Sequence, residues 1–175
     1  MIGEENRIVV NTSPWIALTI RNEIPLLQKL YTEVLIPLGV KEEILEGGEQ
    51  GIGTYELKTS SWLKIEKVVD VEKIKLLYEL EQGEAEVIIL AKEKGIRQVL
   101  IDEKVARLQA KVLGLDVIGT LGVLLKAKKK GMLPSIKPLI KKMLENGIWV
   151  KDEIVKGILK RMFTPAKTHK YRIQG

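Results

Sequence analysis

Short apolar segments alternate with longer helical segments, and this alternation limits the possible folds more than any other feature of the chain. The apolar segments are residues 7–11, 34–36, 98–102 and 116–118. They are rich in Val, Ile and Leu and shorter than typical helices, so each is predicted to be a buried β-strand. Helices are predicted at 14–21, 24–31, from about 40, and at 71–81, 83–94, 104–113 and 120–130. Strands that alternate with helices predict an α/β fold with a mainly parallel sheet.

The remaining segments complete a single domain, which is what 175 residues most economically form. Residues 63–69 are predicted to be an edge strand. The glycine-rich stretch 46–62 is predicted to be a surface connection, because its glycines follow no strand as a phosphate-binding loop would require. Two amphipathic helices are expected at 135–145 and 152–162. We assign 1–150 to the main domain and 151–175 to a C-terminal helix and basic tail.

Composition excludes several classes of protein. The chain has no cysteine, which excludes disulfides, thiolate metal sites and cysteine nucleophiles. It has no apolar run long enough to span a membrane. It also has no leader segment in which basic residues are followed by apolar ones, so we expect a cytoplasmic protein. Abundant Lys, Glu and Ile with few Asn and Gln favour a thermophilic source. The single histidine, His169, lies in a polar tail and does not suggest a Ser-His-Asp triad.

Charge is divided unevenly along the chain. Residues 1–90 hold 9 Lys and Arg against 16 Asp and Glu, whereas residues 91–175 hold 20 against 7. One interpretation is a lysine-rich, solvated surface. The other is that acidic residues surround a bound cation while a basic face binds a polyanion.

Oxygen-bearing side chains gather where the predicted strands end. Ligands of parallel sheets bind outside the carboxyl ends of the strands, so these positions form the candidate site. The first strand ends at Asn11, Thr12 and Ser13, and the 98–102 strand ends at Asp102 and Glu103. Helices that start at the same edge add Glu42 or Glu43, Glu84 or Glu86, and Thr120. Oxygen ligands suit a hard cation such as Mg²⁺ or Mn²⁺.

Four motifs in this order resemble the PIN domain, a compact metal-dependent ribonuclease fold. They are Asn11-Thr12-Ser13-Pro14-Trp15-Ile16, Gly83-Glu84-Ala85-Glu86-Val87-Ile88, Ile101-Asp102-Glu103 and Gly119-Thr120-Leu121-Gly122-Val123-Leu124-Leu125. The resemblance spans about residues 7–135. It implies a three-layer α/β/α arrangement around a short, mainly parallel sheet, with extra C-terminal helices.

The resemblance also implies a set of metal ligands. Asn11 stands where the general family has an acid, although asparagine is not unusual in this branch. The implied metal ligands are Asn11, Ser13, Glu84 and Asp102, and the implied catalytic carboxylates are Glu43, Glu84 and Asp102. Glu42 is the alternative to Glu43, and Glu86 is the alternative to Glu84. Glu84 and Glu86 are about 200° apart around a helix, so only one of them can face the site.

The implied activity is endonucleolytic cleavage of single-stranded or loop RNA with one or two Mg²⁺ or Mn²⁺ ions. Many relatives are toxins of toxin–antitoxin pairs that a small partner protein inhibits, and homodimers are common. We expect RNA contacts at Thr120, Lys126, Lys128, Lys129 and Lys130. The alternative is a catalytically weak module that binds RNA or protein, because Asn11 lacks a charge. Two other interpretations are purely structural, with Asn11 and Thr120 each acting as the N-cap of a helix.

Overall fold

A computed structural model of the chain describes residues 6–48, 50–135, 137–138, 141 and 145. Its centre is a five-stranded, wholly parallel sheet with the strand order β3-β2-β1-β4-β5. The strands are β1 (Arg7–Val10), β2 (Glu33–Pro37), β3 (Leu63–Glu66), β4 (Gln98–Leu100) and β5 (Asp116–Ile118). The predicted α/β fold with a parallel sheet is confirmed.

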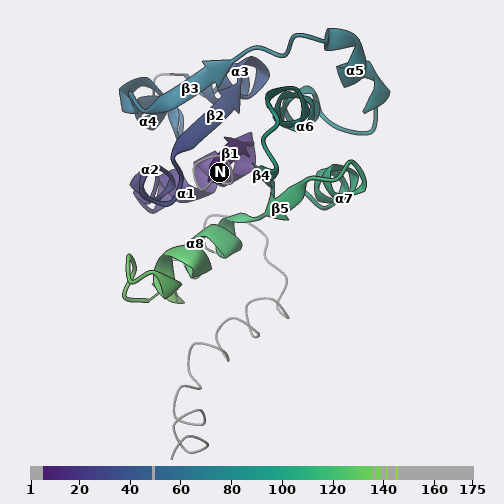
Figure 1. The fold of residues 1–175 in the computed structure, drawn as a ribbon. Helices are drawn as coiled ribbons and strands as arrows, with labels where there is room; N and C mark the ends of the chain where they lie inside the picture. Colours follow the sequence, from purple (N-terminus) through teal and green to yellow (C-terminus); the bar gives the residue numbers. More distant parts are fainter. Residues whose placement is uncertain (1–5, 49, 136, 139–140, 142–144, 146–175) are drawn as a thin grey trace, which may run out of the picture.

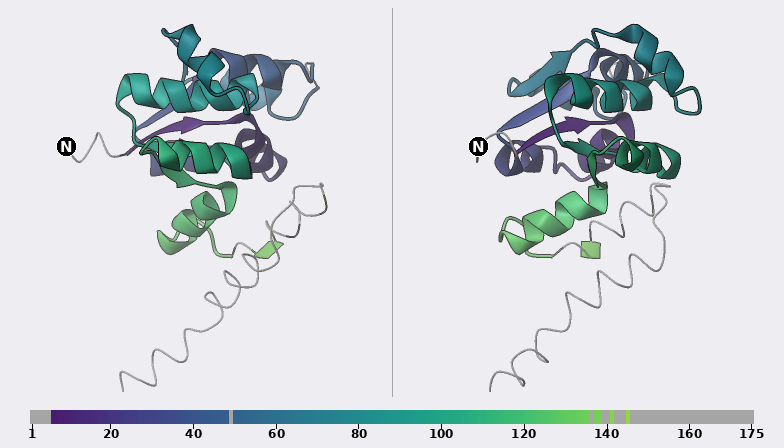
Figure 2. Two further views of the ribbon diagram at one scale, coloured as in Figure 1. Left: turned by 90° about the vertical axis from the view of Figure 1, so that its right-hand side faces the viewer. Right: turned by 45° about the vertical axis from the view of Figure 1, so that its right-hand side comes forward.

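Helices cover both faces of the sheet and give the predicted three layers. They are α1 (Thr12–Ile20), α2 (Pro25–Leu30), α3 (Leu38–Leu45), α4 (Thr54–Thr59), α5 (Val71–Leu76), α6 (Gln82–Lys94), α7 (Lys104–Val112) and α8 (Thr120–Lys129). Figures 1 and 2 show α1, α2 and α8 on one side of the sheet and α6 and α7 on the other. Helix α3 contacts both α1 and α6, so it joins the two outer layers at the end of the strands.

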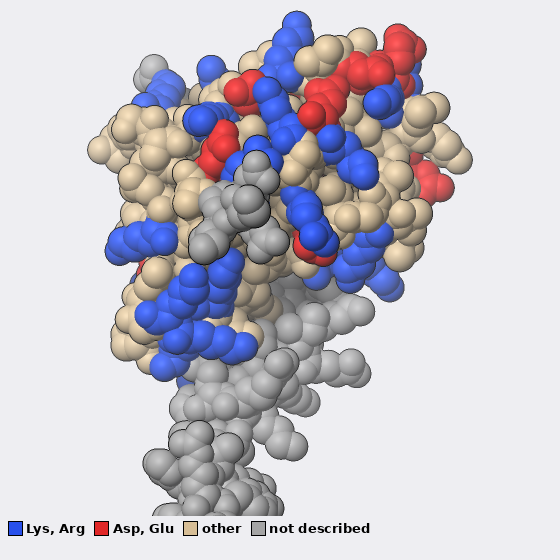
Figure 3. All heavy atoms as spheres, in the orientation of Figure 1, with Lys and Arg blue, Asp and Glu red and all other residues tan. Residues whose placement is uncertain are grey.

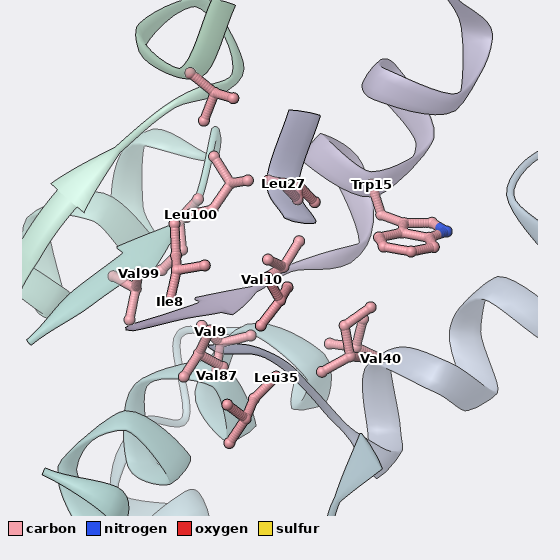
Figure 4. Close-up of a cluster of buried hydrophobic side chains, with 14 of the residues drawn as sticks. Ile8, Val9, Val10, Trp15, Leu27, Leu35, Val40, Val87, Val99 and Leu100 are labelled. Atoms are coloured by element: carbon pink, nitrogen blue, oxygen red, sulfur yellow. The ribbon is translucent and has the colours of Figure 1, made fainter. Parts of the chain in front are cut away.

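The core follows the alternation of side chains along the central strand. Val9 and Val10 point to opposite faces of β1, and Figure 4 shows Val9 on the side of Val87 from α6 and Val10 on the side of Leu27 from α2. Ile8, Val9 and Val10 are all fully buried. A strand that is apolar on both faces is what a parallel sheet covered by two helical layers requires.

The strand order places a topological switch point in the middle of the sheet. The chain builds β1, β2 and β3 outward in one direction, then returns to add β4 and β5 on the other side of β1. The carboxyl ends of β1 and β4 are therefore neighbours, and the backbone amide of Asn11 donates to the carbonyl oxygen of Leu100 at 3.0 Å. We call this side of the sheet, where Val10 and Leu100 end their strands, the carboxyl edge. Crevices at such a point are the usual binding sites of parallel α/β folds.

Several local predictions need correction. The stretch 46–62 is not only a surface connection, because it contains α4, whose Thr54 hydroxyl donates to the carbonyl of Gly48 at 3.0 Å. Helix α5 ends at Leu76 instead of continuing to residue 81, and its residues are not buried. The helix predicted at 152–162 lies outside the described residues, as does most of the one at 135–145. Over the part that is described, no helix is both long and apolar enough to cross a bilayer.

Candidate metal centre

Asn11 ends β1 at the switch point with an unsatisfied oxygen. Its side chain is 2% exposed, and its Oδ1 atom is buried without a hydrogen-bond partner. The residue occupies the N-cap position of α1, yet its side chain makes no capping hydrogen bond. The interpretation of Asn11 as the N-cap is therefore right in position, but the side chain does not do the work of a cap. A buried carbonyl oxygen without a partner costs about 1–3 kcal/mol, so its retention requires another explanation.

Asp102 follows β4 and is held by the start of α8. Its Oδ1 atom accepts from the backbone amide of Thr120 at 2.7 Å, and its Oδ2 atom accepts from the Thr120 hydroxyl at 2.6 Å. Thr120 is itself 2% exposed. The N-cap of α8 is Gly119, with Thr120 as the first helical residue, so the prediction that Thr120 is the cap is wrong. The threonine instead fixes the orientation of a carboxylate at the carboxyl edge.

Arg107 of α7 also reaches this corner of the molecule. Its Nη1 atom donates to the carbonyl oxygen of Ile101 at 2.7 Å. A Cβ atom placed on Gly119 would lie 2.8 Å from that nitrogen and 3.0 Å from Asp102 Oδ1. The guanidinium and the Asp102 carboxylate therefore converge on the same glycine, which leaves room for both groups.

Glu43 and Glu86 connect α3 and α6 in a reciprocal way. Glu43 of α3 accepts a hydrogen bond from the backbone amide of Gly83 at 3.1 Å, at the start of α6. Glu86 of α6 accepts one from the backbone amide of Gly39 at 3.2 Å, at the start of α3. Glu43 also accepts a hydrogen bond from the hydroxyl of Thr12, next to Asn11. Each carboxylate therefore lies at the positive end of the other helix, where its charge is favoured.

Glu84 stands in an acidic environment at the first turn of α6. Its carboxylate accepts from the backbone amide of Glu81 at 3.2 Å, which completes a capping box. Burial raises the pKa of Glu84, and the hydrogen bond from Glu81 opposes that shift. The negative charges of Glu81, Glu103 and Glu43 raise the pKa further. A carboxylate surrounded by like charges is a position that a cation would relieve.

The two pairs of alternative glutamates differ in their surroundings. Glu43 is half-buried and contacts Thr12 and Gly83, whereas Glu42 is exposed. Glu86 is buried against Gly39, and its Oε2 also accepts from Gln82 Nε2 at 3.2 Å, whereas Glu84 is half-buried among the other acids. Ser13 is half-buried in the first turn of α1.

The donor set suits a hard cation with one amide ligand. No three acidic or histidine side chains in the described part of the chain lie close enough together to hold a metal ion. The switch point adds an oxygen of another kind, because its unpartnered atom belongs to the amide of Asn11. Oxygen ligands from Asn11 and neighbouring carboxylates match the chemistry of Mg²⁺ or Mn²⁺, and the buried Oδ1 gives such an ion a ready partner.

The lysines of α8 lie away from this centre. Lys126 stands over the ring of Tyr31, with its ammonium 4.4 Å from the ring centroid and 3.5 Å from the hydroxyl. Burial lowers the pKa of Lys126, and the charge of Lys130 lowers it further. Figure 3 shows Lys and Arg side chains gathered over α8. Lys129 and Lys130 are exposed and Lys128 is half-buried, so these three are open to a polyanion while Lys126 is engaged with Tyr31.

Sequence reasoning did not select Arg107 or Glu81 as parts of this region. Arg107 lies about one helical turn beyond the end of β4. Its sequence distance from Asp102 is the signal that could have placed a basic side chain near that carboxylate. Glu81 precedes the glycine of the second motif, and its role as N-cap is visible as a capping box with Glu84 three residues later.

Comparison with known proteins agrees with this arrangement. The chain matches the family model described as PIN domain over residues 7–163. No curated protein matches it. PIN domains are generally nucleases and generally use divalent metal ions. Because the match covers most of the chain and the fold has the same parallel α/β layers, this chain belongs to the PIN domain family.

Proposed function

We propose that this protein is an endoribonuclease that cleaves single-stranded or loop RNA with Mg²⁺ or Mn²⁺. The observation that carries the proposal is the buried Oδ1 atom of Asn11, which lies at the switch point without a hydrogen-bond partner. At a binding crevice, an oxygen that is already in place can ligate a metal ion. Without a ligand, the same buried oxygen destabilises the fold because it lacks a hydrogen bond.

Each side chain has a part in this proposal. Asn11, Ser13, Glu84 and Asp102 would hold the ion, and Glu43 would complete the acidic surroundings as a catalytic carboxylate. A bound divalent cation would offset negative charge on the phosphoryl oxygens and acidify a water molecule. Thr120 holds both oxygens of Asp102, so this carboxylate is oriented before any ion binds. Thr120 is engaged in that task, which leaves phosphate contacts to the exposed lysines of α8.

A second candidate function is a catalytically weak module that binds RNA or protein. Asn11 supplies an oxygen but no charge, and Glu43 and Asp102 are both committed to hydrogen bonds within the protein. The loss of one carboxylate costs about 1–4 kcal/mol of attraction for a unit charge at about 4 Å. A site weakened to that degree would favour binding over turnover.

The deciding experiment measures cleavage and metal binding together. Labelled single-stranded RNA is incubated with the protein and Mn²⁺, and Mn²⁺ affinity is measured by calorimetry. Asp102→Asn keeps one of the two acceptor oxygens that Thr120 contacts but removes the charge, so it should weaken Mn²⁺ binding and slow cleavage at least tenfold. Asp116→Asn is the matched control, because Asp116 is exposed at the start of β5 and pairs with Arg97. Cleavage that is unchanged by Asp102→Asn would overturn the proposal, and metal binding without cleavage would favour the second candidate.

The cellular setting is proposed on the same basis. We place the protein in the cytoplasm as a homodimer and as the toxin of a toxin–antitoxin pair, with a small antitoxin as its partner. A short gene for an antitoxin-like protein beside its own gene would support this role. Growth arrest on expression of the wild type but not of Asp102→Asn is the corresponding test.

A further inference from the structure

A cavity lies at the opposite end of the sheet from the carboxylates. Its volume is about 400 Å³, and it is lined by Asn6, Gln28, Lys29, Tyr31, Thr32, Val34 and Trp62. Asn6, Thr32 and Trp62 immediately precede β1, β2 and β3, so the cavity opens at the edge where the strands begin. We call this the amino edge. The carbonyl of Asn6 accepts from the amide of Thr32 at 2.9 Å and from its hydroxyl at 3.2 Å, which joins two sides of the cavity.

Two aromatic residues in the wall have different surroundings. The Trp62 ring is half-buried and lies 6.5 Å from the Trp15 ring at an interplanar angle of 47°, so one side of the indole is supported by the core. Tyr31 is buried, its ring carries Lys126 at 4.4 Å, and burial raises its pKa to about 12. Of the two rings, the supported Trp62 is therefore the better platform for a planar ligand.

The polar groups of the wall select the class of ligand. None of the lining residues is acidic, so the cavity carries no negative side chain that would attract a cation. The side-chain amides of Asn6 and Gln28 each carry both a donor and an acceptor, which is the combination that the edge of a nucleobase presents. Lys29 is exposed at the rim and offers a positive charge to a phosphate. Aromatic stacking with polar edge contacts is how proteins bind unpaired bases.

We propose that this amino-edge cavity binds one unpaired base of single-stranded RNA, stacked on Trp62, at a distance from the site of cleavage. The proposal rests on the proposed function for the identity of the nucleic acid. It is supported by α8, whose first residue, Thr120, donates to Asp102 at the carboxyl edge and whose Lys126 reaches Tyr31 in the cavity wall. Six residues of helix span about 9 Å, and the exposed Lys129 and Lys130 lie just beyond. Figure 3 views the amino edge and shows the basic cluster of α8 on this face.

The test is a binding measurement in EDTA, so that it does not depend on cleavage. A labelled single-stranded 2′-O-methyl RNA is titrated with the full chain, followed by a series in which each base in turn is replaced by an abasic residue. One position should lose about 5- to 150-fold in affinity, the range that corresponds to the loss of one base–aromatic stack. In Trp62→Ala that same abasic replacement should have no further effect, because the ring that it stacked on is gone. Trp62→Phe should restore the sensitivity.

Two controls keep the result interpretable. Tyr78→Ala removes an aromatic ring that is 83% exposed beyond α5, and it should leave the abasic profile unchanged. Gln28→Ala changes an exposed side chain at the rim, so it tests the cavity even if Trp62→Ala fails to fold, and it should weaken binding of the intact RNA but not of the abasic one. A flat abasic profile in the wild type would overturn the proposal, as would an absence of RNA binding. A Trp62-dependent profile in a protein that does not cleave RNA would support the cavity and refute the nuclease. Tighter binding of a free nucleotide than of the RNA would overturn the RNA assignment.

Discussion

Asn11→Asp tests both the energetics and the chemistry of the switch point. The substitution adds a carboxylate where the side chain is 2% exposed and its oxygen has no partner. Burial of this kind raises the pKa of an aspartate from about 3.9 to about 7 or above. At pH 7 the metal-free variant should therefore lose as much as about 4 kcal/mol of unfolding free energy, at about 1.4 kcal/mol per pH unit. Because the folded pKa is the higher one, the loss should vanish below about pH 4 and grow as pH rises.

Manganese should reverse this loss. A unit negative charge about 4 Å from a cation adds about 1–4 kcal/mol of attraction, which corresponds to about one to three decades in affinity. Urea unfolding at pH 4 and pH 7, with and without Mn²⁺, measures both effects, and calorimetry gives the affinity directly. Asn11→Ala is the control, because it removes the oxygen without adding a charge and should bind Mn²⁺ less tightly than the wild type. Equal Mn²⁺ affinities for Asn11→Asp, Asn11→Ala and the wild type would refute the placement of a metal at this residue.

Three further predictions address neighbouring parts of the molecule. Glu84→Gln should raise the melting temperature at pH 7.5 but not at pH 4, because the raised pKa of Glu84 means that the fold disfavours its charged form; a stabilisation independent of pH, measured by thermal unfolding, would contradict this. Thr120→Val removes the 2.6 Å hydrogen bond from the hydroxyl to Asp102 and should lower the free energy of unfolding, measured in urea, by about 1.5–3 kcal/mol. Thr120→Ser keeps the hydroxyl and should lower it by less than half as much. Equal losses for the two variants would show that the hydroxyl does not matter. Replacing Lys128, Lys129 and Lys130 by Gln should flatten the slope of log affinity for single-stranded RNA against log salt by about two, and an unchanged slope would make this run an ordinary solvated helix end.

The sequence predicted the layers of this protein because strand and helix periods are strong local signals. Val9 and Val10 place apolar side chains on opposite faces of β1. A strand that is apolar on both faces is typical of a parallel sheet covered by helices on both sides. The boundaries of α5 were less predictable. None of its residues is buried, so no burial pattern marks its end at Leu76. Helix α4 was missed because the glycines that precede it predict a loop. One of them, Gly53, is the N-cap of α4 and adopts a left-handed conformation.

The candidate site was predictable in its residue types but not in its internal bonds. The position of a carboxylate at a strand end follows from the order of elements, so Asp102 could be placed at the carboxyl edge from sequence. Whether that carboxylate would be held by Thr120 depends on the register between β4 and β5, which pairs Leu100 with Ile118. Likewise, the sequence does not show that the Asn11 side chain makes no capping hydrogen bond to α1. An asparagine just before a helix is expected both for a capping residue and for a buried ligand, so the two roles look alike in sequence.

The reciprocal bonds between α3 and α6 have a consequence for which substitutions the chain can tolerate. Gly39 and Gly83 both have backbone angles that any residue can adopt, since neither has a positive φ. A Cβ atom at Gly39 would nonetheless collide with the carboxylate of Glu86, and one at Gly83 with that of Glu43. Alanine at either glycine would therefore displace the opposing carboxylate from its hydrogen bond to that residue's amide, a cost set by the other helix and not by the glycine's own torsion angles. In a library of variants, alanine at either glycine should destabilise the wild type, and the loss should be smaller once the opposing glutamate is shortened, so that each glycine and its glutamate tend to change together.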